Sequence, residues 1–139
     1  MIGIYVLEIS VGRNISLKIG KLGSVNFDKG LYAYVGSAQN NLEKRVKRHL
    51  SKQKKNFWHI DYLLSNKYVK IIGVFFKAAE KSEECEFAAE LAKSSLPVTG
   101  FGSSDCECTS HLYKLRGVQF LRQCMTEKQW CSLGQGEAK

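Results

Sequence analysis

The chain has 139 residues, 44% of them hydrophobic, which suits one domain with a hydrophobic core and excludes a disordered chain. Lys and Arg number 21 against 13 Asp and Glu, and the formal net charge of +8 favours a polyanionic partner such as a nucleic acid. Charge alone is equally compatible with a soluble cationic protein that binds nothing specific. The sequence has neither an apolar stretch long enough for a membrane span nor the features of a signal peptide, so we expect a cytoplasmic protein with no membrane partner.

The first part of the chain predicts three strands. Residues 2–9 and 31–36 are rich in β-branched and aromatic side chains, and residues 15–19 alternate apolar with polar ones. Residues 22–30, which are glycine-rich and polar, are expected to form a loop between the second and third strands.

Helices and strands then alternate. Asn40 is the expected N-cap of a helix, with Glu43 at the capping-box position and an apolar stripe of Leu42, Val46 and Leu50. The next segment, over 57–64, is expected to be a short helix or an irregular stretch. After it come a buried strand over 69–76, a helix capped by Ser82, a loop over 94–110 and a last strand over 112–121. This order predicts a compact α+β domain over 1–133, with a small mixed or antiparallel sheet of about three to five strands flanked by helices, and a flexible tail over 134–139.

The first helix carries two residues that could take part in chemistry. Arg45 and His49 fall together at one edge of its apolar stripe, where they could bind a phosphate and assist a leaving oxygen. The alternative is a solvated basic helix on which both side chains merely extend toward water. Further cations are expected to point outward and follow a nucleic-acid backbone: Lys44, Lys47, Arg48, Lys52, Lys54 and Lys55.

Other polar residues leave two interpretations open. His59 lies among aromatic residues, where a lone histidine is more often a hydrogen-bonded packing residue than a catalyst. Asp61 could orient a neighbour or cap a helix. Four carboxylates crowd the helix that begins near Ser82, and they form either a solvated face or a divalent-cation site: Glu83, Glu84, Glu86 and Glu90. Helical periodicity does not choose between Glu84 and Glu86 as a metal ligand.

Two short motifs resemble a known nuclease superfamily. Gly3-Ile4-Tyr5 is similar to the first signature of the GIY-YIG nucleases, and Tyr34-Val35-Gly36 is similar to the second. The gap between them is longer than in the better-known members and holds the 15–19 strand and the glycine-rich loop. By this resemblance Arg45 stands at the position of an essential arginine, His49 and His59 resemble histidines that follow it, and Glu86 matches the metal-binding glutamate.

The resemblance is closer to one branch, a small archaeal and bacterial domain of unknown function (DUF123-like) that is sometimes fused to endonuclease III-like proteins. The similar segments span the chain up to about Tyr113 and comprise Gly36-Ser37-Ala38, Arg48-His49-Leu50, residues 58–64, Glu84-Cys85-Glu86 and residues 102–112. Each motif is short, and their order and joint presence carry the resemblance.

The superfamily resemblance implies a compact GIY-YIG-like fold and a metal-dependent endonuclease that hydrolyses DNA phosphodiester bonds. A Mg²⁺ or Mn²⁺ ion on Glu86 would polarise the phosphate, and Arg45 would neutralise charge on the pentavalent phosphorus. Tyr5 would activate or position water with help from Tyr34 or His49, since a phenol alone is a weak base. A role in DNA repair, with a repair-protein partner, and RNA as substrate stay as hypotheses. A non-catalytic DNA- or RNA-binding module with the same fold is the main alternative.

The five cysteines are an odd number at uneven spacing, which favours reduced thiols or metal ligands over a disulfide framework. Cys106, Cys108 and His111 supply three of the four ligands of a structural zinc site. The Cys-x-Cys spacing is tighter than in common zinc motifs, so polar contacts from Asp105 or His111 beside the active cleft, or a disulfide, are alternatives. If zinc organises this segment, the chain could instead be a metal-bound interaction domain.

Overall fold

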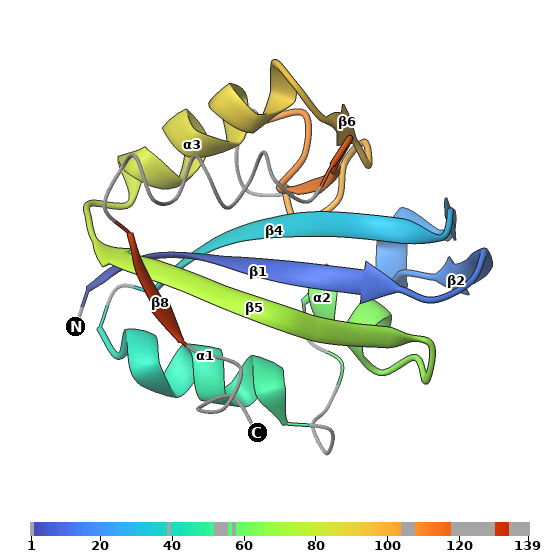
Figure 1. The fold of residues 1–139 in the computed structure, drawn as a ribbon, viewed down its shortest axis with the longest axis horizontal. Coiled ribbons are helices and arrows are strands. Elements are labelled where there is room, and N and C mark those ends of the chain that lie inside the picture. The colour runs from blue at the N-terminus through green and yellow to red at the C-terminus, as the bar shows by residue number, and fades with distance from the viewer. Residues whose placement is uncertain are drawn as a thin grey trace.

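The computed structural model describes residues 2–38, 40–51, 56, 58–103, 108–117 and 130–133. Its strands and helices follow one another along the chain as β1 Gly3–Val11, β2 Ile15–Lys18, the 3₁₀ turn η1 Gly20–Leu22, β3 Ser24–Phe27, β4 Gly30–Ala38, α1 Leu42–Leu50, α2 His59–Leu64, β5 Val69–Ala78, α3 Ser82–Ala92, β6 Leu96–Pro97, β7 Leu112–Lys114 and β8 Cys131–Leu133. Figure 1 shows the long strands β4, β1 and β5 side by side through the middle of the molecule.

The principal sheet has six strands in the order β6-β7-β4-β1-β5-β8, and all of its ladders are antiparallel. The predicted α+β class with a small antiparallel sheet is confirmed, although the sheet has more than five strands. The additional members, β6 and β8, are two and three residues long. Segments this short show no alternation in the sequence, so only their pairing identifies them.

Helices cover both faces of this sheet, α1 and α2 on one side and α3 on the other (Figure 1). The alternation of side chains along β1 divides the core accordingly. Tyr5, Leu7 and Ile9 pack toward α1 and α2, whereas Ile4 and Val6 pack toward α3. Three layers therefore enclose two hydrophobic clusters, one on each face of the sheet.

Several predicted boundaries differ from the structure. The loop expected at 22–30 contains β3, which pairs with β2 in a separate two-stranded sheet. The N-cap of α1 is Asn41 rather than Asn40, because the Asn41 side chain accepts the Lys44 amide at 2.9 Å. Helix α3 begins after Lys81 with no side-chain cap, so the predicted capping role of Ser82 is wrong. Strand β7 ends at Lys114, and residues 118–121 and the predicted tail at 134–139 lie outside the described residues.

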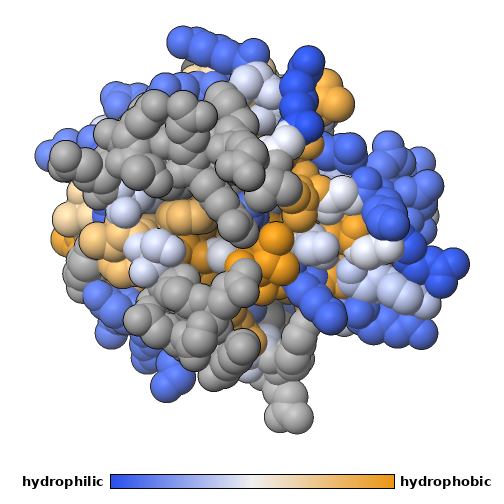
Figure 2. Space-filling view, viewed as in Figure 1, coloured by the Kyte–Doolittle hydropathy of each residue, from blue (hydrophilic) through white to orange (hydrophobic). Residues whose placement is uncertain are grey.

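In the view of Figure 2 hydrophilic residues surround the rim of the molecule, while hydrophobic residues come to the surface near the middle of the face. Within the described part of the chain, the exposed large apolar residues are Ile2 and Leu96, at 52% and 53% exposure. None of the helices that the structure describes combines the length and apolar character needed to cross a membrane.

Candidate functional site

The two tyrosine-glycine motifs lie side by side. Tyr5 on β1 and Gly36 on β4 are direct antiparallel partners, and the β2–β3 hairpin occupies the long sequence gap between the motifs. The Tyr5 ring lies so close over Gly36 that a Cβ there would approach the ring to 2.4 Å. Gly3 has a similar role, since its Cβ would lie 2.3 Å from the Lys77 carbonyl oxygen on β5. Close packing therefore requires both glycines, Gly36 against the Tyr5 ring and Gly3 against the backbone of β5, and neither is required by an unusual backbone conformation.

A buried hydrogen bond joins the first motif to helix α1. The Tyr5 hydroxyl and the His49 Nε2 atom are 2.7 Å apart, and both residues are at most 2% exposed. Tyr34 completes an aromatic group with them, its ring centroid 6.2 Å from that of His49. The predicted residues Tyr5, Tyr34 and His49 thus converge, because positions 5 and 34 point to the same sheet face that α1 covers.

Arg45 lies one helical turn before His49 and is only partly buried. Its guanidinium donates to the Ser37 carbonyl oxygen at 2.9 Å, near the end of β4. The same guanidinium lies 4.5 Å from the centre of the Trp58 ring, so an aromatic surface supports one side of the cation. Arg45 is held at the end of β4 with part of its charge facing solvent.

Arg48 departs from its predicted outward position. It forms two hydrogen bonds with Asp61, at 2.9 and 3.0 Å, and its guanidinium lies 4.4 Å from the centre of the Trp58 ring. Asp61 is fully buried and also accepts the Trp58 amide at 2.8 Å. Sequence periodicity could not show this pairing because Asp61 comes from the next helix. The Arg48 guanidinium pairs with the buried Asp61 carboxylate, so Arg48 does not point outward as a phosphate contact in this structure.

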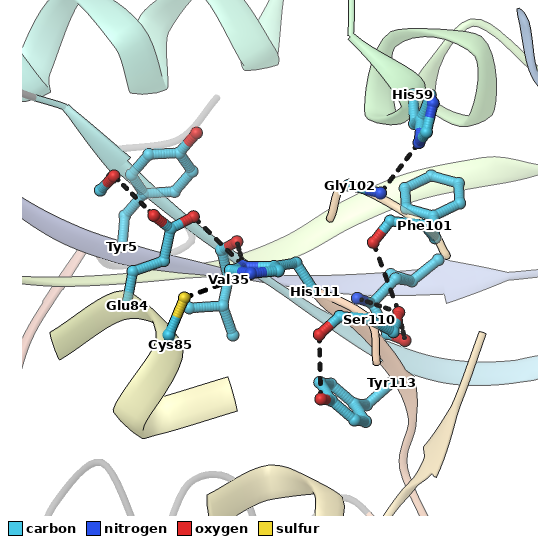
Figure 3. Close-up of polar contacts among 12 residues, drawn as sticks. Tyr5, Val35, His59, Glu84, Cys85, Phe101, Gly102, Ser110, His111 and Tyr113 are labelled. Atoms are coloured by element: carbon cyan, nitrogen blue, oxygen red, sulfur yellow. Dashed lines mark hydrogen bonds and ion pairs between the residues drawn. The ribbon is translucent and has the colours of Figure 1, made fainter. Parts of the chain in front are cut away.

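Glu84, rather than Glu86, faces the residues around Tyr5. One Glu84 carboxylate oxygen accepts the Ser37 hydroxyl at 2.8 Å, and the other lies 3.2 Å from His111 Nδ1. Figure 3 shows Glu84 between this end of the sheet and the His111 ring, with Tyr5 nearby. Glu86 is exposed and belongs to a surface hollow beside Ile4 and Lys77, on the α3 side. Two positions along a helix rotate a side chain by about 200°, which separates the two carboxylates.

Burial controls the acidity of the two tyrosines. Removal from water raises the pKa of Tyr5 well above its ordinary value, with smaller increases from Glu84 and Asp61, and the adjacent Arg45 guanidinium opposes this rise. The pKa of Tyr34 is raised for the same main reason, and the neighbouring Tyr5 and Glu84 add to it. Both phenols are therefore neutral near pH 7, and either can donate a hydrogen bond.

His59 stands apart from the Tyr5–His49 pair. Its Nδ1 atom accepts the Gly102 amide at 2.9 Å (Figure 3). Its ring contacts Phe101, which in turn contacts Tyr34. Burial lowers the pKa of His59, which favours the neutral imidazole that this hydrogen bond requires. Its position fits a role in holding the loop that contains Phe101.

Apart from Arg48, the predicted nucleic-acid contacts divide into two groups. Lys44 and Lys47 are exposed on α1, as the sequence predicted. Lys52, Lys54 and Lys55 lie outside the described residues. The exposed lysines lie on the helix that carries Arg45, so a bound polyanion could contact them together.

A second polar cluster lies beside α3. Side-chain atoms of Cys85, Cys108 and His111 lie within 4.8 Å of one another, close enough to hold one metal ion. Cys106, which the sequence suggested as a ligand, lies outside the described residues, and Cys85 supplies the third donor instead. Sequence spacing missed Cys85 because 22 positions separate it from Cys108 and only the packing of α3 brings them together. None of the three described cysteines forms a disulfide.

The chain was compared with known protein families and with known proteins. Residues 4–130 match a family described as a domain of unknown function, DUF123. Neither the curated proteins nor the solved structures contain a match to this sequence.

Proposed function

Since the chain belongs to the DUF123 family, whose function is unknown, we propose from its own site that it is a metal-dependent endonuclease that hydrolyses phosphodiester bonds in DNA. The convergence of Tyr5, Arg45 and Glu84 at the end of β4 is the observation that carries this proposal. These groups come from β1, α1 and α3, which are far apart in the sequence. A hydroxyl, a guanidinium and a carboxylate at one place provide the groups that phosphodiester hydrolysis uses.

The half-buried rim of the site suits a phosphate. Arg45 and Ser37 are partly exposed, and the Glu84 side chain is 16% exposed. A phosphate near Arg45 would receive charge-assisted hydrogen bonds from the guanidinium. The exposed Lys44 and Lys47 would hold the neighbouring backbone without reading its sequence.

A single carboxylate fits a magnesium site completed by substrate. Mg²⁺ usually binds one or two carboxylates together with phosphate oxygens and water, and Glu84 offers one at the rim of the site. A Mg²⁺ or Mn²⁺ ion bound there would stabilise negative charge on the phosphate and on the leaving oxygen. Thiolates prefer softer ions, so a zinc ion at Cys85, Cys108 and His111 would be separate from this one.

The Tyr5–His49 pair gives the attacking water a path for its proton. Water oxygen forms the new bond to phosphorus while the bond from phosphorus to the leaving oxygen breaks, and the leaving oxygen departs as an alkoxide that takes a proton from solvent. The water proton passes to the Tyr5 oxygen as the Tyr5 proton passes to His49 Nε2, which lies 2.7 Å away. This coupled transfer avoids a free phenolate, which burial makes unfavourable. Arg45 neutralises the charge that develops on the pentavalent phosphorus.

A cleavage assay on labelled DNA with Mg²⁺ or Mn²⁺ tests the proposal. Duplex, branched and single-stranded substrates, with RNA in parallel, would define the substrate class. Arg45→Ala and Glu84→Gln should each lower the cleavage rate by about 100-fold or more, as loss of a charge-stabilising group does in other enzymes. Glu86→Gln changes the same group two positions along α3, and Arg13→Ala removes a cation beside Tyr68 away from the site. Both of these variants should cleave at the rate of the unmodified protein.

The near-complete burial of Tyr5 and His49 favours one alternative, a nucleic-acid-binding module without catalysis. In that case DNA would bind with a strong salt dependence through the α1 cations, but no metal would induce cleavage. DNA binding by the unmodified protein, Arg45→Ala and Glu84→Gln, with no cleavage by any of them, would establish the alternative. Loss of activity in Glu86→Gln but not in Glu84→Gln would move the metal to the sequence-predicted residue. A role in DNA repair remains a further hypothesis, which requires preference for damaged or branched substrates.

A further inference from the structure

We propose that Cys85, Cys108 and His111 bind one zinc ion, and that Glu84 orients its histidine ligand. The three residues come from α3 and from the segment that leads into β7, and their donor atoms lie within 4.8 Å of one another. Two sulfurs and one imidazole nitrogen form a donor set that zinc accepts. This inference rests on these contacts alone and is independent of the proposed nuclease activity.

The separation between ligand atoms fits a tetrahedral ion. Zinc binds sulfur at about 2.3 Å and nitrogen at about 2.0 Å, so tetrahedral geometry places a sulfur and a nitrogen about 3.5 Å apart. Cys85 Sγ and His111 Nε2 are 3.9 Å apart. A displacement of a few tenths of an ångström would bring this pair to the spacing of zinc ligands. Figure 3 shows the Cys85 sulfur directed toward the His111 ring.

His111 Nδ1, the nitrogen that faces away from the thiols, contacts oxygen acceptors, as the distal nitrogen of a zinc-bound histidine usually does. His111 Nδ1 lies 3.2 Å from a Glu84 carboxylate oxygen and 3.2 Å from the Val35 carbonyl oxygen. Two acceptors at this distance favour a proton on Nδ1, which leaves Nε2 as the nitrogen directed toward the thiols. A carboxylate or carbonyl that accepts from the distal nitrogen of a histidine fixes its tautomer and strengthens it as a ligand. Glu84 is therefore a positioning residue for His111.

A cavity gives an ion access to these residues. Its volume is about 440 Å³, and it is lined by Cys85, Ala89, Ala92, Cys108, Thr109 and Tyr113. Both cysteines are partly exposed, whereas His111 is buried beneath them. The space beside the two sulfurs has room for a fourth ligand, which would complete the four-coordinate geometry of zinc.

Glu84 joins this cluster to the candidate active site. Its second carboxylate oxygen accepts the Ser37 hydroxyl, and the Ser37 carbonyl oxygen accepts Arg45. A zinc ion on His111 would fix the imidazole and thereby the carboxylate that it contacts. The proposed site thus predicts that zinc stabilises the position of Glu84 while the zinc ligands themselves remain on the α3 side.

Cobalt(II) titration of the reduced, metal-free full chain is the direct test. The expected result is one cobalt ion per chain, with thiolate charge-transfer absorption and the intense visible bands of a tetrahedral ion, both lost on addition of zinc. Cys85→Ser and Cys108→Ser should each remove these bands, whereas Cys131→Ser, an exposed thiol on β8, should leave them unchanged. Glu84→Gln should retain the bands but lower zinc affinity by about 10- to 100-fold, as loss of a partner of a histidine ligand does elsewhere.

Several outcomes would overturn the proposal. One is a reduced, folded, unmodified chain that shows no thiolate–cobalt absorption. Another is loss of the bands in Cys106→Ser but not in Cys85→Ser, which would identify the site suggested by sequence spacing. Isolation of the reduced protein with copper(I), or exclusive formation of a Cys85–Cys108 disulfide with no metal uptake, would also exclude zinc. Because the titration contains no nucleic acid, failure of the nuclease proposal would not change its result.

Discussion

The two polar clusters at the end of β4 differ in their chemistry although both contact the same strand. The cluster on the α1 side contains a phenol, an imidazole and a guanidinium, centred on Tyr5, His49 and Arg45. The cluster on the α3 side contains two thiols and the His111 imidazole. Oxygen and nitrogen groups suit phosphate and hard cations, whereas thiols select softer metals. The sheet therefore separates two kinds of ligand chemistry, and Glu84 links them, since it contacts His111 directly and reaches Arg45 through Ser37.

The clusters also differ in exposure. Tyr5 and His49 are almost completely buried, so substrate would meet the α1-side cluster through Arg45, Ser37 and Glu84 at its rim. The two thiols border a cavity and are open to a diffusible ion. This contrast indicates that the α1 side depends on packing for its geometry, whereas under our zinc proposal the α3 side would depend on a bound ion. The following predictions test that division.

The largest effect is expected for Tyr5→Phe, which removes one hydroxyl on the α1 side. If Tyr5 conducts a proton to His49, the cleavage rate should fall by about 100- to 10,000-fold, the usual range for a group in acid–base catalysis. Tyr32→Phe is the control, since its hydroxyl donates to the Asp28 carbonyl oxygen at the other end of β4. Rates are measured at saturating DNA and metal. A loss of zinc affinity in Tyr5→Phe would show that the two clusters are not separate.

Arg48→Ala should destabilise the fold by about 3–5 kcal/mol, because it leaves the buried Asp61 carboxylate without its cation. Lys47→Ala, at the neighbouring exposed position of α1, should change the free energy of unfolding by less than about 0.5 kcal/mol. Urea denaturation of both variants measures the difference. Equal stabilities would mean that Arg48 is a surface cation, as the sequence suggested. The division of α1 into a structural Arg48 and phosphate-binding lysines would then lose its support.

Gly36→Ala tests the packing of the Tyr5 ring. The added Cβ would lie 2.4 Å from the phenol, so Tyr5 or β4 must move, at a cost of about 1–3 kcal/mol. Gly117→Ala meets no atom within 4 Å and should be neutral or slightly stabilising. Thermal unfolding compares the two variants, and the cleavage assay shows whether the ring displacement abolishes activity. Normal stability and activity in Gly36→Ala would contradict the close approach that links the two motifs.

The smallest effect concerns pH. Because folding lowers the pKa of His59 from its ordinary value of 6.5, the unfolded chain takes up a proton more readily than the folded one. The stability that depends on neutral His59 is thus fully present above about pH 6.5 and is lost as the pH falls toward the lowered pKa. His59→Asn keeps a hydrogen-bond acceptor that does not titrate there, so its stability should fall less on acidification. The free energy of unfolding of both proteins is measured from pH 7.5 to 5. Equal dependence on pH in the unmodified protein and His59→Asn would show that His59 does not contribute to the loss of stability in acid.

The sequence predicted much of the local structure correctly. Alternation identified the strand at 15–19, and the apolar stripe of Leu42, Val46 and Leu50 identified α1. The short edge strands were missed, since two or three residues are too few to show a period. The same periodicity placed Arg45 and His49 on one edge of α1, where the structure finds them beside the buried face.

The sequence could not decide which residues from distant segments would meet. Glu84 and Glu86 were equally suitable by type, and only the packing of α3 against β4 directs Glu84 toward Ser37. Cys85 lay outside any recognisable metal motif until the fold placed it beside His111.

By itself the sequence determined the basic charge, the family and the elements that carry Tyr5, Tyr34, Arg45 and His49, because composition and periodicity are local properties. The tertiary structure decided the partners: Tyr5 with His49, Arg48 with Asp61, and Glu84 with His111. Such pairs depend on strand register and helix rotation, where a shift of one residue reverses the face of a strand or turns a helix by about 100°.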